Sequence, residues 1–354
     1  MKQPSSTFAL ANLAQLTPRR IALLAGLALL TLALLLTLGG GQAALQAVMG
    51  ADLRWLGLAL LIHYSGFAVR GLRWQQLLRL LGYPLGWRYS TALLLSGWFA
   101  SALLPARAGD LLRVGALRLA HEAHPPVPVA DGLGSIVLER VLDLLALLLL
   151  GAGLGFLLLR TQLPTWVVGA YGVGLVALVV LTIALVAAPA LLRWLRTWFT
   201  HAWWQQLLDF AAELVQSLRA LGTHPLVALL VISESLYIWL CDALLMWLVL
   251  RSMGVATGFG SIAFVALTVD IFAAIPLTPG GIGQIEAVNA TLLALLPLPP
   301  FNVAAAVLLN RAISYWSFLL FSGLVTFAAG IGQLLVREQR NQSISKDEKD
   351  ERDL

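Results

Sequence analysis

The sequence predicts an all-α, polytopic membrane protein with six full spans and two broken, re-entrant helical hairpins. Of the 354 residues, 59% are hydrophobic and 12% are charged, whereas a soluble domain carries roughly 25% charged residues. The mean hydropathy is +0.85. The apolar residues are gathered in long blocks, and a helix needs about 20 residues to cross a bilayer.

Six blocks are long enough to span the membrane, at residues 21–38, 53–80, 131–159, 165–192, 224–250 and 302–335. Residues 21–38 carry no charged side chain, and a soluble core has no need of helices that are apolar on every face. Arg19 and Arg20 precede this block, and no cleavage pattern of small residues follows it, so we interpret it as an uncleaved span.

Two further apolar stretches are interrupted in the middle by Pro and Gly. The first breaks at residues 105–109 and resumes at Asp110, and the second breaks at residues 276–283 and resumes at Gln284. Each half is too short to cross the bilayer as a helix rising 1.5 Å per residue. We therefore expect two re-entrant hairpins, or eight helices if each hairpin is counted as two spans.

The distribution of arginines assigns the orientation of the chain. One face of the predicted bundle receives both termini and Arg70, Arg73, Arg79, Arg88, Arg113, Arg118, Arg193, Arg196 and Arg219, whereas the other receives Arg54, Arg160 and Arg251. Cytoplasmic loops carry the excess of Lys and Arg. The protein is expected in the cell inner or plasma membrane with both termini in the cytoplasm.

Three segments follow along the chain. Residues 1–20 are a cytoplasmic N-terminal segment, 21–335 the transmembrane domain, and 336–354 a charged, disordered cytoplasmic tail. Within the domain, the tryptophan-rich and arginine-rich segment 193–221 is either a helix at the membrane interface or a packed helix–turn–helix connector. The net charge of +5 does not indicate nucleic acid, because the basic residues flank apolar blocks.

The two broken stretches match one another. Pro105 and Gly109 correspond to Pro279 and Gly283 at an offset of 174, and the segment 138–143 corresponds to 309–314 at an offset of 171. Repeat one then covers about 21–160 and repeat two about 165–335. Each half holds three spans and a hairpin, so the second half is inserted upside down. Inverted repeats with broken helices are common in transporters, with the binding site near the bilayer midplane.

Ionisable side chains occur within these segments, where charge is costly. Even the lower insertion scales give about 2.5–3.5 kcal/mol for Arg or Asp at a helix centre. Such groups pair with one another, face water or meet a charged ligand. The candidates for substrate binding are Arg107, Gly109, Asp110, Glu139, Arg140, Asp143, Gly280, Gly281, Gly283, Glu286 and Arg311.

Geometry favours an anionic ligand at these positions. Glu139 and Asp143 are four residues apart and share one helix face. The half-helices that begin near Asp110 and Gln284 direct free N–H groups and a positive dipole end at the hairpin tips. With the arginines, these groups can accept a lipid phosphate. The alternative is that the charges only neutralise each other and lock the hairpins. Weaker candidates, as proton carriers, are Asp270, Asp242 and Glu234.

These motifs together resemble the transmembrane region of lysylphosphatidylglycerol synthase, a flippase-like family that also occurs as stand-alone proteins. The resemblance is carried by residues 105–110, 139–143, 279–286 and 311–316, and covers roughly residues 15–335. The segment 70–74 fits the same pattern and adds Arg70, Arg73 and Trp74 as lipid-interface residues. In the two-part synthases this region is thought to translocate the lipid that a separate soluble domain aminoacylates.

The resemblance implies lipid transport rather than catalysis. We expect a translocase for an anionic or amphiphilic lipid, such as a phospholipid or a polyprenyl-phosphate derivative. Aminoacyl transfer is not expected, because no segment here is long enough for the soluble domain. The alternatives are an intramembrane lipid-linked glycosyl or phosphoryl transferase, with Glu139 or Asp143 as base, and a membrane anchor for a separate soluble lipid-modifying enzyme. No cofactor, metal or nucleic-acid partner is expected, and the oligomeric state is left open.

Overall fold

The computed structural model describes residues 40–103, 108–119, 126–158, 165–199, 201–274 and 278–329, with a few isolated positions before residue 40. These residues are almost entirely helical, and none of them forms a β-strand. The prediction of an all-α fold is confirmed. Both predicted tails, and the first predicted span apart from isolated positions, lie outside the described residues.

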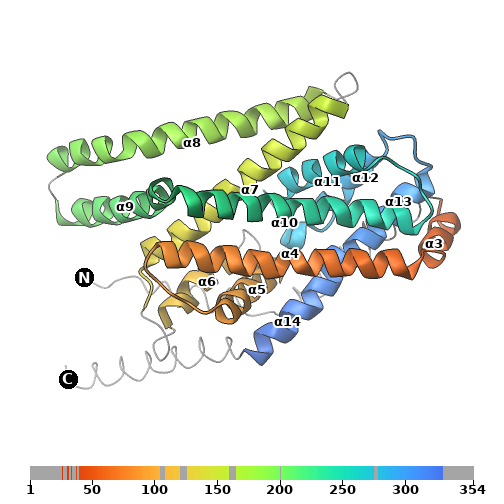
Figure 1. Cartoon of the computed structure of the whole chain (residues 1–354), viewed down its shortest axis with the longest axis horizontal. Helices are drawn as coiled ribbons and strands as arrows, with labels where there is room; N and C mark the ends of the chain where they lie inside the picture. The colour runs from red at the N-terminus through yellow and green to blue at the C-terminus, as the bar shows by residue number, and fades with distance from the viewer. Residues whose placement is uncertain are drawn as a thin grey trace.

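The elements follow the order of the predicted spans (Figure 1). Short 3₁₀ segments at Leu221–Thr223 and Pro279–Gly281 and a π-helical segment at Ala312–Ser317 connect helices. The α-helices are α3 (Gln42–Met49), α4 (Leu53–Leu80), α5 (Trp87–Leu103), α6 (Ala108–Leu119), α7 (Val129–Leu158), α8 (Thr165–Trp198), α9 (Ala202–Ala220), α10 (Pro225–Ser252), α11 (Phe259–Ala273), α12 (Gln284–Leu293), α13 (Pro300–Arg311) and α14 (Phe318–Ala328).

Four helices are long and apolar enough to cross a membrane: α4, α8, α10 and the continuous helix Pro300–Ala328 that joins α13 to α14. They coincide with four of the predicted spans. Helix α7 coincides with a fifth and has 30 residues, but it carries several ionisable side chains. Helix starts follow ordinary capping rules: the Asp52 carboxylate accepts the Arg54 N–H at the start of α4, and Pro225 begins α10.

Both interrupted stretches form pairs of short helices. Helices α5 and α6 pack closely against each other at Gly97 and Gly109. A Cβ atom at Gly109 would collide with the carbonyl oxygen of Gly97, so this close approach requires glycine at position 109. Helices α11 and α12 also pack together, with the Pro279–Gly281 segment between them. Pro105 and Arg107, at the first predicted tip, lie outside the described residues.

The long helices α4 and α10 run side by side through the centre of the molecule (Figure 1). Helix α10 also packs against α7, α11 and α13, and the largest apolar core gathers around its second half. Buried Val249, Ile262, Leu293 and Val307 come from four different helices in this core. This largest core is therefore built mainly by helices α10, α11, α12 and α13.

The segment 193–221 is divided between two helices. Helix α8 continues past Pro189 to Trp198, and α9 then packs against both α8 and α7. Trp194, Trp198 and Trp203 are exposed. The segment therefore contains two helices packed together, and its position relative to the membrane interface stays a prediction. The most apolar 18-residue window of α8 has no buried residue, so this helix lies along the outside of the bundle.

Three arginines that the sequence analysis assigned to the cytoplasmic face are buried, and they no longer count as evidence for the orientation of the chain. Arg70, Arg73 and Arg113 are buried, at 4%, 0% and 1% exposure, and form ion pairs inside the bundle. A paired interior arginine carries no information about orientation. Among the described residues, Arg79, Arg88, Arg193, Arg196 and Arg219 are exposed and retain the predicted charge asymmetry.

Candidate functional site

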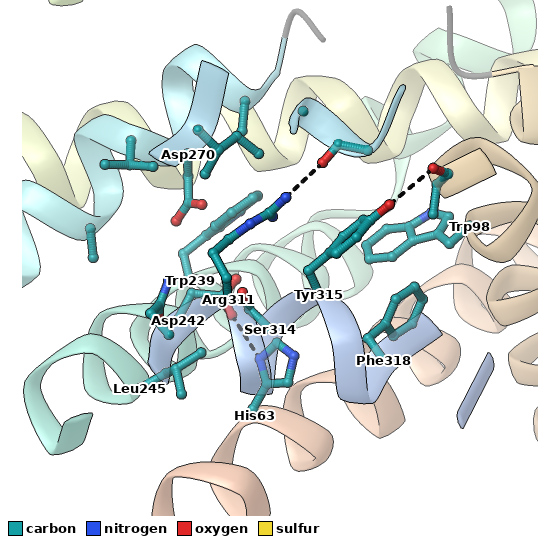
Figure 2. Close-up of a pocket in the computed structure, with 18 of the residues that line it drawn as sticks. His63, Trp98, Trp239, Asp242, Leu245, Asp270, Arg311, Ser314, Tyr315 and Phe318 are labelled. Carbon is teal, nitrogen blue, oxygen red and sulfur yellow. Dashed lines mark hydrogen bonds and ion pairs between the residues drawn. The ribbon is translucent and has the colours of Figure 1, made fainter. Parts of the chain in front are cut away.

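A cavity of about 300 Å³ lies where the two broken helices meet the long ones. Its lining comes from α4, α5, α6, α7, α10, α11 and α12, and from the helix that joins α13 to α14 (Figure 2). Charged side chains share the wall with aromatic rings and aliphatic side chains. A wall of this composition can hold a polar headgroup and its apolar attachment together, and the volume is within the range of small-molecule sites.

A buried chain of ion pairs ties the first hairpin to its neighbours. Arg113 Nη2 lies 2.6 Å from Glu139 Oε2, and both side chains are fully buried. Arg73 lies 2.8 Å from Asp143 and 3.7 Å from the other oxygen of Glu139. The Arg113 guanidinium also lies 4.0 Å from the ring centroid of Trp74. This chain holds α4, α6 and α7 together, because removing one member would leave a buried charge unpaired.

Arg140 closes the same network at the cavity wall, with looser contacts. Its guanidinium lies 3.6 Å from Asp110 and 3.5 Å from Asp143, and its side chain is 32% exposed. It lines the cavity, and Trp98 lies 6.0 Å from it. A partly exposed arginine with long ion pairs keeps hydrogen-bond donors available for a ligand.

The second hairpin holds its arginine closely. Arg311 Nε donates to Glu286 at 2.7 Å, and Nη2 donates to the Gly280 carbonyl at 3.1 Å. The other oxygen of Glu286 accepts the Gly283 N–H at 2.7 Å, so one carboxylate both caps α12 and pairs with Arg311. Gly280 has φ +61°, and a Cβ there would collide with the ring of Tyr315. Only glycine fits this turn without strain.

A third group of charges lies on the α4–α10 side of the cavity. Arg70 pairs with Asp242 at 3.0 Å, and the Nδ1 atom of His63 lies 3.3 Å from the other Asp242 oxygen. The Arg70 guanidinium lies 5.2 Å from the ring of Trp98 and 5.1 Å from that of Trp239. Rings at this range stabilise a cation that is largely removed from water.

The structure brings most of the predicted residues to one place but divides them by role. The cavity is lined by Arg70, Asp110, Arg140, Asp143, Gly280, Gly281 and Arg311. The lining does not include Gly109, Glu139, Gly283 or Glu286, and the two glutamates are buried. Arg107 lies outside the described residues. Arg73 and Trp74, expected at the lipid interface, are fully buried instead, because they pair with Asp143 and Ser135.

Sequence reasoning missed several cavity residues, among them His63, Trp98, Trp239 and Asn289. Asn289 is 1% exposed, and neither its side-chain oxygen nor its nitrogen has a hydrogen-bond partner among the described residues. A polar side chain within an apolar block was the available signal for Asn289. The aromatic residues gave none, because tryptophan is common throughout this chain.

No metal-binding group stands out in this part of the chain. Among the described residues, no cluster of three or more His, Cys, Asp or Glu side chains has the arrangement of a metal site. The single cysteine, Cys241, is buried and free.

Long apolar helices, two interrupted ones and ion pairs held inside the bundle define a multi-pass membrane protein. The chain belongs to the family of the lysylphosphatidylglycerol synthase transmembrane region, which matches residues 21–322. The resemblance seen in the motifs is thereby confirmed.

Curated relatives include one protein with a named activity. The glycosyltransferase AglD of Haloferax volcanii is 29% identical, and the match covers 90% of this chain and 54% of AglD. A UPF0104 membrane protein of Methanothermobacter thermautotrophicus is 28% identical over 81% of this chain and 87% of its own length. A UPF0104 membrane protein of Methanocaldococcus jannaschii is 22% identical over 69% of this chain. No solved structure matches the chain.

Proposed function

We propose that the protein is a lipid translocase that moves an anionic or amphiphilic lipid between leaflets. Arg140 carries the proposal: its side chain is 32% exposed, and it lies on the wall of a cavity that is both charged and apolar. An arginine can bind a phosphate through two parallel hydrogen bonds. The lipid is a phospholipid or a polyprenyl-phosphate derivative.

Asn289 supports a ligand that forms hydrogen bonds. Leaving a buried donor or acceptor unsatisfied costs about 1–3 kcal/mol. The Asn289 amide, buried at the cavity wall, has both a free donor and a free acceptor among the described residues. A phosphate ester bearing hydroxyl groups would satisfy both, and water would satisfy them between transport cycles.

The arrangement of helices supports the transporter class. Helices α4 and α10 each have 28 residues, and they begin 172 residues apart, at Leu53 and Pro225. This spacing agrees with the offsets of the two sequence motifs. We propose the inverted repeat of six spans and two re-entrant hairpins, with both termini cytoplasmic in the cell membrane. The cavity between the repeats is then the substrate site.

The relationship to AglD favours a second candidate. This chain spans about half the length of that glycosyltransferase. The second candidate is a membrane partner of a separate soluble lipid-modifying enzyme. An intramembrane glycosyl or phosphoryl transferase is the other enzymatic alternative. Glu139 is a poor base for such a reaction, since it is fully buried between Arg73 and Arg113. Asp143 lines the cavity and is the better candidate.

Lipid exchange in liposomes tests the proposal. The full chain is reconstituted with phosphatidylglycerol carrying a dithionite-reducible fluorophore, and the loss of inner-leaflet protection is followed over time. We expect faster exchange than in protein-free liposomes, with no new lipid product by mass spectrometry. Arg140→Ala should slow exchange about tenfold or more, because a hydrogen bond to a charged group contributes about 1.5–3 kcal/mol.

Arg88→Ala is the matched control, since Arg88 is an exposed arginine at the start of α5. It should exchange lipid like the wild type. A new lipid product would support the transferase alternative, and neither exchange nor product would support the anchor alternative. Equal rates for wild type, Arg140→Ala and Arg88→Ala would contradict a substrate role for Arg140.

A further inference from the structure

One carboxylate that lines the cavity belongs to none of the ion pairs that the described residues form around it. Five arginines, Arg70, Arg73, Arg113, Arg140 and Arg311, are each joined to carboxylates, and those pairs contain five carboxylates in total. Asp270 is a sixth. It lines the same cavity, but its side chain forms no hydrogen bond or ion pair with any described residue. The paired groups are neutral as a set, so the charge of Asp270 is uncompensated among the described residues.

The neighbours of Asp270 cannot supply the missing charge. Asp242 on α10 and Asp143 on α7 both act on it as like charges. Arg70, the one cation of the described part of the chain that acts on it, already pairs with Asp242. A partly buried carboxylate that lines a cavity and has no partner is costly to keep charged.

The other helices packed around α11 bring no unpaired positive charge near Asp270 within the described residues. Tyr171 on α8 faces α11 and forms a hydrogen bond with Thr268. On α12, Glu286 already pairs with Arg311, and the cavity-lining Gln284 and Asn289 are neutral. Nothing packed against this helix therefore provides a spare positive charge within the described residues.

A second protonatable group lies across the cavity. His63 is 4% exposed, lines the cavity and contacts Asp242 through Nδ1, while its Nε2 has no hydrogen-bond partner among the described residues. Figure 2 shows Asp270 and His63 reaching the cavity from different helices, with Asp242 between them in this view. Histidine is the side chain that changes charge most readily near neutral pH. The cavity thus has groups that can receive and pass on a proton.

We propose that Asp270 is a proton-binding site, and that the protein couples the movement of an anionic lipid to the movement of a proton. The inference rests on the proposed function. A phosphate bound beside Arg140 adds a negative charge to a cavity that already has one in excess. A proton taken from water by the Asp270 carboxylate offsets that charge, and it is returned to water on the other side when the lipid leaves. His63, on the wall of the same cavity, is a second group that can carry the proton.

A pH step across liposomes tests the coupling. The full chain is reconstituted with the fluorescent phosphatidylglycerol, with the interior held one pH unit more alkaline than the outside. One proton moving with one singly charged lipid transfers no net charge. The inner-to-outer ratio of the lipid should therefore rise toward about tenfold, the factor that one pH unit represents for a single proton. Trapped pyranine should report proton uptake that requires the lipid.

Asp270→Asn removes the proton site while keeping the shape of the neutral side chain. This variant should still exchange lipid, but it should reach equal leaflet distribution and show no lipid-dependent proton uptake. Asp209→Asn, an exposed aspartate on α9, is the matched control and should behave like the wild type. Accumulation by Asp270→Asn, or equal leaflets in a wild type that exchanges lipid, would overturn the coupling. Accumulation driven by a sodium gradient at equal pH would also overturn it.

Infrared difference spectroscopy separates this inference from the proposed function. During a pH titration of the purified protein, a protonated-carboxyl band should appear in the wild type and in Asp209→Asn, and be lost in Asp270→Asn. The band without any lipid exchange would retain the proton site and reject the translocase. Its absence in a wild type that exchanges lipid would reject the proton site alone. Asp270→Asn that fails to fold would also contradict the inference, because a neutral side chain is one of its two working states; Asp270→Glu should keep the band.

Discussion

Arg140 and Arg311 occupy matching positions in the two predicted repeats, 171 residues apart, but their surroundings differ. Arg311 has ion-pair and hydrogen-bond distances of 2.7 and 3.1 Å, and its side chain is 8% exposed. Arg140 has ion pairs of 3.5 and 3.6 Å, and its side chain is 32% exposed. The same residue type therefore anchors one hairpin and is open to ligand in the other.

The carboxylates explain the difference. Glu286 is the third residue of α12 and is held by the Gly283 N–H, so it meets Arg311 in a fixed geometry. On the other side, Asp110 and Asp143 are each shared between Arg140 and a buried arginine, Arg113 or Arg73. For each of these two carboxylates, the contact with Arg140 is longer than the contact with the buried arginine. In the inverted repeat that we propose, a structural arginine and the proposed ligand-binding arginine line the same cavity.

The largest expected effect is on the stability of the Arg311 half. Arg311→Ala leaves Glu286 buried and unpaired, which should lower the free energy of unfolding by about 3–5 kcal/mol. Thermal melting of the purified protein in detergent measures it. Adding Glu286→Gln should recover part of the loss, since the amide still accepts the Gly283 N–H without a charge. If Arg311→Ala melts like the wild type, the anchoring role is wrong.

The next effect is on transport in the Arg140 half. Arg140→Lys keeps the charge but loses the planar pair of donors. It should exchange lipid at a rate between the wild type and Arg140→Ala, with a stability change of about 1 kcal/mol or less, as for exposed ion pairs. Exchange and melting are measured on the same preparations. A variant that loses stability as strongly as Arg311→Ala would remove the distinction between the two arginines.

The smallest effect concerns the turn that positions Arg311. Gly280→Ala should destabilise the protein by about 1–2 kcal/mol through its left-handed backbone alone, and further through the collision with Tyr315. Gly82→Ala is the control, because Gly82 also has a positive φ, +93°, but open space around it. Melting of both variants isolates the contribution of the crowded turn. Equal losses would show that Tyr315 moves aside freely.

The helices were largely predictable because hydropathy along the chain reports them directly. The starts and ends of α4 and α10 fall within two residues of the predicted spans. Two features were missed. The short helix α3 has no apolar block of its own. Helix α8 continues from its predicted end at residue 192 to Trp198, through a segment whose arginines, Arg193 and Arg196, end the apolar block but not the helix.

The sequence predicted which ionisable residues form the site, but it did not predict which of them form ion pairs with one another. Ionisable residues within apolar blocks are visible in a sequence, and Asp110, Arg140, Asp143 and Arg311 were found in this way. Their partners were not, because the pairs join distant residues, such as Arg70 with Asp242. Arg113 shows the consequence: the sequence treated it as a topology signal, and only packing shows that it neutralises Glu139.

The π-helical segment at Ala312–Ser317 has a mechanical consequence for the helix that contains Arg311. It lies between α13, fixed to the second hairpin through Glu286, and α14, which packs against α5 of the first. Wide turns of this kind interrupt the regular hydrogen-bond ladder and are preferred places for a helix to bend. Ser314 and Tyr315 of the cavity wall belong to this segment. The two hairpins are therefore joined by one continuous helix, and the segment of that helix that bends most easily lies at the cavity.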